Sequence, residues 1–190
     1  MSKQETQPPR KFIIQMSGAP GSGKSTLASL LGRSTGAVVI DHDQLRSAML
    51  DLPFDQAAKL AYRVQWSLVR EMARQGHNVI IDSTCNYPEV LDRGTECARE
   101  HGYAYWYVEC RADDIELLDS RLRARDPLPS QRTAVDRPPQ VAGVVGDQRA
   151  VFRKWMTDPC RPQEDSAIII VESTGEPKQL RDQVLAKILG

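Results

Sequence analysis

A glycine-rich segment near the N-terminus carries the clearest chemical signal in the sequence. SGAPGSGKST (17–26) fits the pattern G-x-x-x-x-G-K-[ST]. Glycines let successive backbone N–H groups point inward, which makes an anion-binding loop, and a following helix adds its positive dipole end. The lysine would contact the β- and γ-phosphates of a nucleotide, and the serine hydroxyl would bind Mg²⁺. We therefore predict ATP and Mg²⁺ as ligands, with the loop residues Gly18, Ala19, Pro20, Gly21, Ser22, Gly23, Lys24, Ser25 and Thr26 at the nucleotide and Ser25 on the metal.

A pair of aspartates follows a short apolar run in IDHDQLR (40–46). Asp41 and Asp43 leave a strand end on the same side of the backbone because they are two residues apart. We predict that Asp41 faces Mg²⁺ and that Asp43 is the general base for an acceptor hydroxyl. Arg46 lies one helical turn after Asp43 and would bind an anionic group of the acceptor. In the alternative interpretation, Asp43 is a helix N-cap and Arg46 a surface charge.

A second apolar run, NVIID (78–82), ends in an aspartate and resembles a Walker B segment. Asp82 would contact the metal or its waters. Polar groups follow it directly, and among them Asn86 is a candidate for contact with the acceptor. The alternative interpretation is a buried strand that ends in a capping aspartate.

Three arginines alternate along SRLRAR (120–125). Arg121 and Arg125 share a helix face, whereas Arg123 points elsewhere. We predict that Arg121 and Arg125 are catalytic and contact the γ-phosphate and the charge that develops on it.

The segment 126–165 interrupts an otherwise regular alternation of strands and helices. It contains four prolines between 127 and 139, and residues 121–161 hold eight Arg and one Lys against four Asp. An irregular basic segment beside a phosphate site is typical of a lid. Arg132 and Arg137 are second candidates for contact with the substrate. A solvated surface loop with ordinary charge pairs is the alternative.

These candidates must be brought together by the elements between them. Five expected strands (12–17, 37–40, 78–82, 103–109 and 167–171) alternate with helices expected from about 25, at 44–50, 56–75, 88–102, 113–125, about 146–157 and 177–189. This order predicts an α/β fold with a mainly parallel sheet. Ligands bind beyond the carboxyl ends of such strands, where the glycine loop, DHD and DST converge. After the last strand, the backbone at Gly175 would line the adenine.

Length and composition set broad limits. We expect a disordered tail at 1–10 and a single domain at 11–190 with the lid inserted at about 126–165. The 25 basic and 25 acidic residues balance, which weighs against a chain dedicated to nucleic acid. The four cysteines lack metal spacing and are expected to be reduced thiols. Because neither a signal peptide nor an apolar span is evident, we expect a cytoplasmic protein without a membrane partner or an obligate protein partner.

Taken together, GAPGSGKST, IDHDQLR, IIDSTCN and SRLRAR resemble the kinase domain of the 5′-polynucleotide kinases and the related zeta-toxin-like P-loop kinases. The resemblance covers roughly 12–125 plus the last strand and helix. It implies that Asp43 is the general base, that Arg46 binds a phosphate of the acceptor, that Asp82 helps to place the acceptor, and that Arg125 is the lid arginine on the phosphates.

The pair Asp41 and Asp43 is also similar to the D-x-D of small-metabolite kinases such as shikimate kinase, in which the first aspartate serves magnesium. That resemblance implies a three-layer sandwich with strand order 2-3-1-4-5. By contrast, LPSQRTAVDRPP (128–139) matches nothing in the polynucleotide kinase pattern, and we expect no attached phosphatase or ligase module.

The expected activity is transfer of the γ-phosphoryl group of ATP to a hydroxyl. The acceptor would be a small metabolite or the 5′-OH end of a nucleic acid. The alternative is a nucleotide-binding switch or slow ATPase that has no acceptor and does not need Asp43 as a base.

Overall fold

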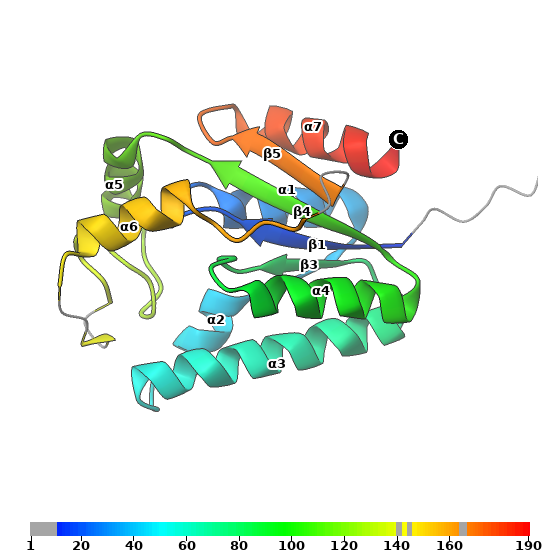
Figure 1. Ribbon diagram of the computed structural model, residues 1–190, viewed down its shortest axis with the longest axis horizontal. Coiled ribbons are helices and arrows are strands. Elements are labelled where there is room, and N and C mark those ends of the chain that lie inside the picture. The colour runs from blue at the N-terminus through cyan, green and yellow to red at the C-terminus, as the bar shows by residue number, and fades with distance from the viewer. Residues whose placement is uncertain (1–10, 140–141, 144–145, 164–166) are drawn as a thin grey trace, which may run out of the picture.

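The structure is a computed structural model that describes residues 11–139, 142–143, 146–163 and 167–190. The expected disordered tail at 1–10 lies outside the described residues. Strands and helices alternate along the chain (Figure 1). The elements are β1 (Phe12–Ser17), α1 (Lys24–Thr35), β2 (Val38–Asp41), α2 (His42–Ser47), α3 (Phe54–Arg74), β3 (Val79–Asp82), α4 (Pro88–His101), β4 (Ala104–Arg111), α5 (Ile115–Ala124), α6 (Gln148–Thr157), β5 (Ile168–Glu172) and α7 (Pro177–Leu189).

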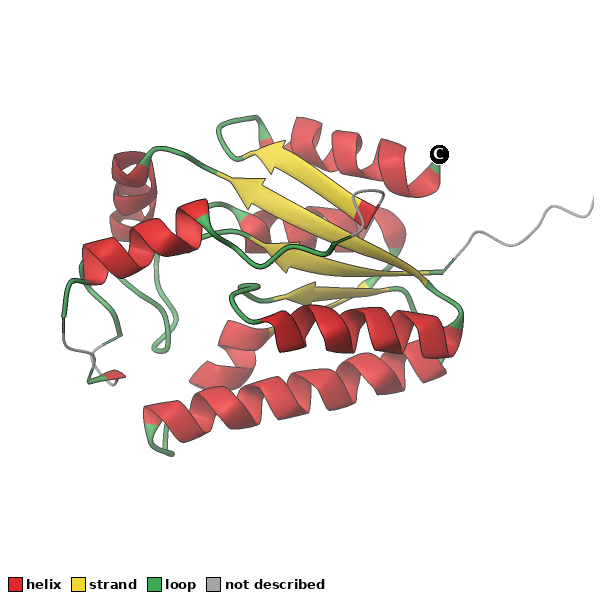
Figure 2. Ribbon diagram, in the orientation of Figure 1, coloured by secondary structure: helices red, strands yellow, loops and turns green. Residues whose placement is uncertain are grey.

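The five strands form one sheet in the order β2-β3-β1-β4-β5, and every neighbouring pair is parallel. This confirms the predicted fold class and strand order, with all of the described sheet parallel where a mainly parallel sheet was expected. Helices cover both faces of the sheet and give three layers (Figure 2). All five strands end at the same edge, so the loops that follow β1, β2 and β3 meet there.

Two apolar cores hold the layers together, and β1 supplies both because its side chains alternate between the faces. Phe12, Ile14 and Met16 pack with α1 and α7, while Ile13 packs with α3 and α4. Such a strand is buried on both faces, which explains its largely apolar sequence.

The helix after β2 begins earlier than the sequence indicated. It was expected at 44–50 but spans His42–Ser47, directly after the strand. Asp41 is the N-cap, and its Oδ1 accepts hydrogen bonds from the backbone N–H groups of Asp43 (2.7 Å) and Gln44 (3.4 Å). The capping role considered for Asp43 therefore belongs to Asp41, and the Asp43 carboxylate does not cap this helix.

The described part of the expected lid includes α6, which confirms the helix expected at about 146–157. A third apolar cluster joins this region to α5 and to the glycine loop; its members are Ala19, Ala112, Leu118, Leu122, Val135 and Phe152. The basic segment therefore packs on α5 and the glycine loop through a shared apolar cluster. Within the residues described, no helix has the length and hydrophobicity needed to cross a bilayer.

Candidate active site

A cleft of about 960 Å³ lies at the carboxyl edge of the sheet. Its walls come from the glycine loop, α2, the start of α3, the loops after β3 and β5, α5 and the lid. The three sequence motifs predicted to converge therefore line one cavity. A volume of this size accommodates a nucleotide with a small second ligand.

The glycine loop forms one end of the cleft, and its backbone needs glycine at two positions in particular. Gly18 has φ 128°, and a Cβ there would lie 2.4 Å from the carbonyl oxygen of Cys110. Gly23 has φ 87° and is the N-cap of α1. Because both positions favour a residue without a side chain, the loop can curl and present its N–H groups at the start of α1. Pro20 to Thr26 line the cleft, whereas Gly18 and Ala19, also predicted to contact the nucleotide, lie outside its lining.

Lys24 begins α1, and its Nζ donates a hydrogen bond to the Ala19 carbonyl oxygen at 3.1 Å. Burial lowers the pKa of Lys24, while the negative charges of Asp82 and Asp43 act in the opposite direction. The ammonium group is thus folded back over its own loop, and it lies within the electrostatic influence of both carboxylates.

Two carboxylates stand side by side next to the loop. Asp41 and Asp82 are register partners at the ends of β2 and β3. Burial, and then the neighbouring Asp41 charge, raises the pKa of Asp82 to about 6, although the Ser25 hydroxyl and Lys24 oppose this shift. Burial also raises the pKa of Asp41. A pair of crowded carboxylates beside a hydroxyl is an oxygen donor set that suits Mg²⁺ shared with phosphate oxygens.

No cluster of three or more His, Cys, Asp or Glu residues with metal-binding geometry occurs in the described part of the chain. Mg²⁺ held by Ser25, Asp41 and Asp82 would therefore also need oxygens from the nucleotide or from water, as is usual for this ion in nucleotide sites. These three ligands remain a prediction.

Asp43 and Arg46, both on α2, line the same cleft as the glycine loop, and we call their part of it the acceptor end. Arg46 donates to Asp43 Oδ1 at 2.9 Å, and Gln131 Nε2 donates to Asp43 Oδ2 at 2.8 Å. Burial raises the pKa of Asp43, but hydrogen bonds from His42 and Gln131 and the Arg46 charge outweigh it and hold the pKa at about 2. The Asp43 carboxylate is consequently ionised, and each of its oxygens accepts a hydrogen bond.

Aromatic side chains surround this pair. The Arg46 guanidinium lies 5.0 Å from the centre of the Phe54 ring, and the rings of His42 and Tyr62 are 3.9 Å apart. His42 is buried, and its Nε2 has no hydrogen-bond partner among the described residues. Sequence analysis missed His42, Tyr62 and Gln131. The position of His42 inside DHD was the only signal that pointed to one of them.

The two predicted catalytic arginines have different surroundings. Arg121 donates to Ser173 Oγ (3.0 Å), to the Ser173 carbonyl (2.9 Å) and to the Gly21 carbonyl (3.5 Å). It therefore ties the glycine loop to the loop after β5. Arg125 donates to the Arg132 carbonyl at 2.9 Å, and its buried Nε has no partner in the described chain. Both arginines line the cleft, and their catalytic roles remain predictions.

The remaining predicted residues divide into two groups. Asn86 and Gly175 line the cleft, as does Arg132. The Arg132 guanidinium, however, is engaged inside the lid by the Val135 carbonyl at 2.5 Å and Gln148 Oε1 at 2.7 Å, so these groups compete with any substrate. The structure does not bring Arg137 to the cleft, because this residue is exposed and lies outside its lining.

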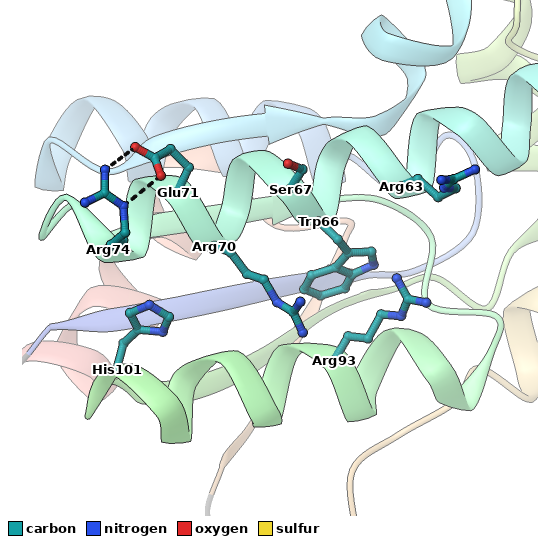
Figure 3. Close-up of a pocket in the computed structure, with 8 residues that line it drawn as sticks. All are labelled: Arg63, Trp66, Ser67, Arg70, Glu71, Arg74, Arg93 and His101. Atoms are coloured by element: carbon teal, nitrogen blue, oxygen red, sulfur yellow. Dashed lines mark hydrogen bonds and ion pairs between the residues drawn. The ribbon is translucent and has the colours of Figure 1, made fainter.

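A second hollow of about 670 Å³ lies between α3 and α4 and contains four arginines (Figure 3). Two of the four are paired with acids: Arg74 contacts Glu71 at 2.7 Å, and Arg70 contacts Glu96 at 3.6 Å. None of the residues predicted for the site lies here. We therefore assign the candidate site to the cleft at the sheet edge.

A glycine loop of this kind on a parallel sheet of order 2-3-1-4-5 defines a P-loop nucleotide-binding domain. Residues 13–153 match a protein-family model described as an AAA domain, and the chain belongs to this family, AAA_33. A search of curated proteins finds no match.

Solved structures show the same fold at low sequence identity. A protein from Chloroflexus aurantiacus J-10-fl has a TM-score of 0.70 and 14% identity, with 94% of this chain and 98% of that chain covered. The APS kinase CysC of Mycobacterium tuberculosis, in complex with AMPPNP and APS, has a TM-score of 0.62 and 18% identity over 96% and 100% of the two chains. A gluconokinase from Sinorhizobium meliloti 1021 has a TM-score of 0.59 and 15% identity over 95% and 91%.

The fold is therefore that of the P-loop kinases, as predicted. Both named enzymes among these structures are small-molecule kinases. The narrower resemblance to polynucleotide kinases and zeta-toxin-like proteins gains no specific support from them.

Proposed function

We propose that the chain is an ATP-dependent kinase that transfers the γ-phosphoryl group to a hydroxyl of a small anionic metabolite. One observation carries this proposal: a single cavity is lined by both the phosphate loop and the Asp43–Arg46 pair. A nucleotide-binding switch without an acceptor would not need a held carboxylate and an arginine facing the phosphates across a cleft. The fold shared with small-molecule kinases supports the same assignment.

Each of the predicted site residues would have its own role in phosphoryl transfer. The glycine loop and Lys24 would bind the β- and γ-phosphates, and Arg125 would stabilise the charge that develops on the transferred group. Mg²⁺ bound by Ser25, Asp41 and Asp82 would neutralise phosphate charge. Arg46 would bind the anionic group of the acceptor, with its guanidinium already fixed over the Phe54 ring.

Asp43 would orient the acceptor hydroxyl and accept its proton as the new P–O bond forms and the bond to the ADP oxygen breaks. A carboxylate whose pKa is held at about 2 is a weak base. This suits a loose transition state, in which the hydroxyl proton is lost late and positioning contributes more than proton abstraction. The low pKa also keeps Asp43 ionised at any physiological pH.

The charge pairs of the lid favour a small acceptor over the nucleic-acid end that the sequence left open. Arg123 is paired with Asp119 and Asp136, Arg149 with Glu116, and Arg161 with Glu109. These pairs leave fewer arginines to neutralise successive phosphates of a strand. We place the anionic contact of the acceptor at Arg46, which would share its hydrogen bonds to Asp43 and to the Ser130 carbonyl with that group.

Label transfer from γ-labelled ATP tests the proposal. The acceptors are APS, gluconate, shikimate and a 5′-OH oligonucleotide, each at low and moderate salt. We expect label in one of the small acceptors with little dependence on salt. Transfer to the oligonucleotide with a log–log salt slope well beyond ~−0.7, the value for one phosphate contact, would replace the small acceptor by a nucleic acid. Release of labelled phosphate without transfer to any acceptor would favour the slow ATPase.

A further inference from the structure

The segment 128–139, which matched no family pattern, begins with a tight turn that is built to present its side chains. Pro129 occupies the second position of the turn, where its fixed φ is favourable, and the Gln131 N–H donates to the Leu128 carbonyl at 2.8 Å. The Gln131 Oε1 in turn accepts from the Leu128 N–H at 3.2 Å. Because one end of the amide is held by its own turn, the Nε2 group has a fixed direction.

Ser130 anchors this turn on α2. It is completely buried, and its carbonyl accepts from Arg46 at 2.7 Å. Its hydroxyl lies 2.8 Å from Ser47 Oγ and donates to the Asp43 carbonyl at 3.2 Å, while its N–H donates to Ser47 Oγ at 3.3 Å. Four hydrogen bonds from one buried residue hold the lid against the helix that carries the predicted base, 83 or more residues away in sequence.

The docked turn places Gln131 on the Asp43 carboxylate. Gln131 Nε2 lies 2.8 Å from Oδ2, whereas Arg46 lies 2.9 Å from Oδ1, which His42 Nδ1 also faces at 3.7 Å. Gln131 is therefore the donor on Oδ2. A carboxylate oxygen has a second lone pair, which remains for an acceptor hydroxyl. Two donors on opposite oxygens fix the plane of the carboxylate as well as its position.

On the basis of the proposed function, we propose that the Leu128–Gln131 turn completes the acceptor site and that Gln131 is a positioning residue for Asp43. Gln131 acts through the carboxylate and does not itself exchange a proton. Its contribution is geometric, because a displacement of about 1 Å in a reacting group can cost ~10²-fold in rate. The lid then belongs to the acceptor site through residues that no motif marks.

Gln131→Met tests this role because methionine keeps the length of the side chain and removes the donor. Thr133→Ala is the control, since Thr133 is exposed in the same segment and lies outside the cleft lining. Transfer is measured to whichever of APS, gluconate, shikimate or the 5′-OH oligonucleotide the wild type labels. We expect kcat to fall ~10-fold or more in Gln131→Met, with KM for ATP within about twofold, and no change in Thr133→Ala. The unchanged KM for ATP also shows that the variant is folded.

Ser130→Ala provides an independent test of whether the anchoring of the turn on α2 positions Gln131 on the Asp43 carboxylate. If Gln131 depends on the anchor, the double variant Ser130→Ala/Gln131→Met is no slower than the slower single variant, because the residues act as one unit. Additive effects would overturn the inference, and so would a Gln131→Met enzyme at wild-type kcat. Faster transfer in Gln131→Met would show that the amide competes with the acceptor and would overturn it as well. A wild type that labels no acceptor overturns the proposed function itself, which is a different result.

Discussion

The nucleotide end of the cleft is built mainly from backbone groups, whereas the acceptor end is built from side chains. At the nucleotide end, one contiguous segment supplies backbone N–H groups, and the positive φ of Gly18 and Gly23 sets the shape of the loop. At the acceptor end, side chains from α2 and α3 meet a turn of the lid, and the contact between Gln131 and Asp43 joins residues 88 positions apart. The first end is fixed by local backbone conformation and the second by tertiary hydrogen bonds.

This difference has consequences for function. A backbone cradle binds the phosphates of any nucleotide and hardly changes when a surface side chain changes. An acceptor end made of side chains can be altered one residue at a time, which changes the second substrate while the first is kept. Substitutions at the two ends should therefore separate nucleotide binding from phosphoryl transfer.

The largest effect is expected at the acceptor end. Asp43→Asn removes the charge that orients the hydroxyl and takes up its proton, and transfer should fall ~10²–10⁴-fold. ATP affinity should stay within a few-fold, because Asp43 is predicted to face the acceptor and not the nucleotide. Transfer of label and binding of a fluorescent ATP analogue measure the two quantities. Loss of nucleotide binding with normal transfer per bound ATP would assign Asp43 to the metal instead.

Lys24→Ala should have the next largest effect and act at the opposite end. A preorganised charge on the transferred phosphoryl group is worth ~10²–10³-fold in turnover, and its removal should also weaken nucleotide binding. The matched control is Lys178→Ala, at an exposed position of α7. Turnover of ATP at the wild-type rate in Lys24→Ala would refute the phosphate-loop assignment. Asp43→Asn and Lys24→Ala should thus differ in nucleotide affinity although both lose turnover.

The same contrast explains what the sequence could predict. The alternation of strands and helices, the helix at about 146–157 and the convergence of Asp41, Asp43 and Asp82 at one edge follow from local patterns and from the rules of parallel sheets. The strand order came from the resemblance to small-metabolite kinases. The contact of Gln131 with Asp43 could not be predicted, because Gln131 lies in a proline-rich segment without periodicity. The partners of Arg132 were missed for the same reason. A count of arginines predicted a basic lid, which stays a prediction, but did not reveal which of these arginines are bonded within the segment.

Asp82 allows the metal assignment to be tested through stability. Its pKa is raised to about 6 by burial and by Asp41, whereas in the unfolded chain it is near 4. Above pH 6 the Asp82 carboxylate is ionised in both states and is better solvated in the unfolded chain, which lowers the stability of the folded protein. Below pH 4 Asp82 is largely protonated in both states, and this cost disappears. Asp82→Asn should therefore raise the free energy of unfolding by about 3 kcal/mol at pH 8 without metal, and by little at pH 4.

Urea unfolding at pH 8 and pH 4 in a chelator measures this gain. Asp92→Asn, at an exposed position of α4, is the control. The stabilised variant should lose Mg²⁺-dependent transfer, because the carboxylate pair that destabilises the free protein is the pair that would bind the ion. An equal gain in the free energy of unfolding at both pH values would mean that the charge of Asp82 does not destabilise the folded protein. The metal assignment would then lose its electrostatic support.

The smallest effect should separate the two catalytic candidates on α5. Arg121 donates hydrogen bonds to Ser173 and to the Gly21 carbonyl. Arg121→Ala should therefore loosen the loops around the nucleotide and weaken ATP binding ~10-fold. Its kcat at saturating ATP should be retained. Arg125 has a buried Nε without a described partner, so Arg125→Ala should lower kcat more than affinity. Arg153→Ala, exposed on α6, controls for loss of charge. If Arg121→Ala instead lowered kcat at saturating ATP, Arg121 would contact the transferred phosphate, and its bonds to Ser173 would have to break when the nucleotide binds.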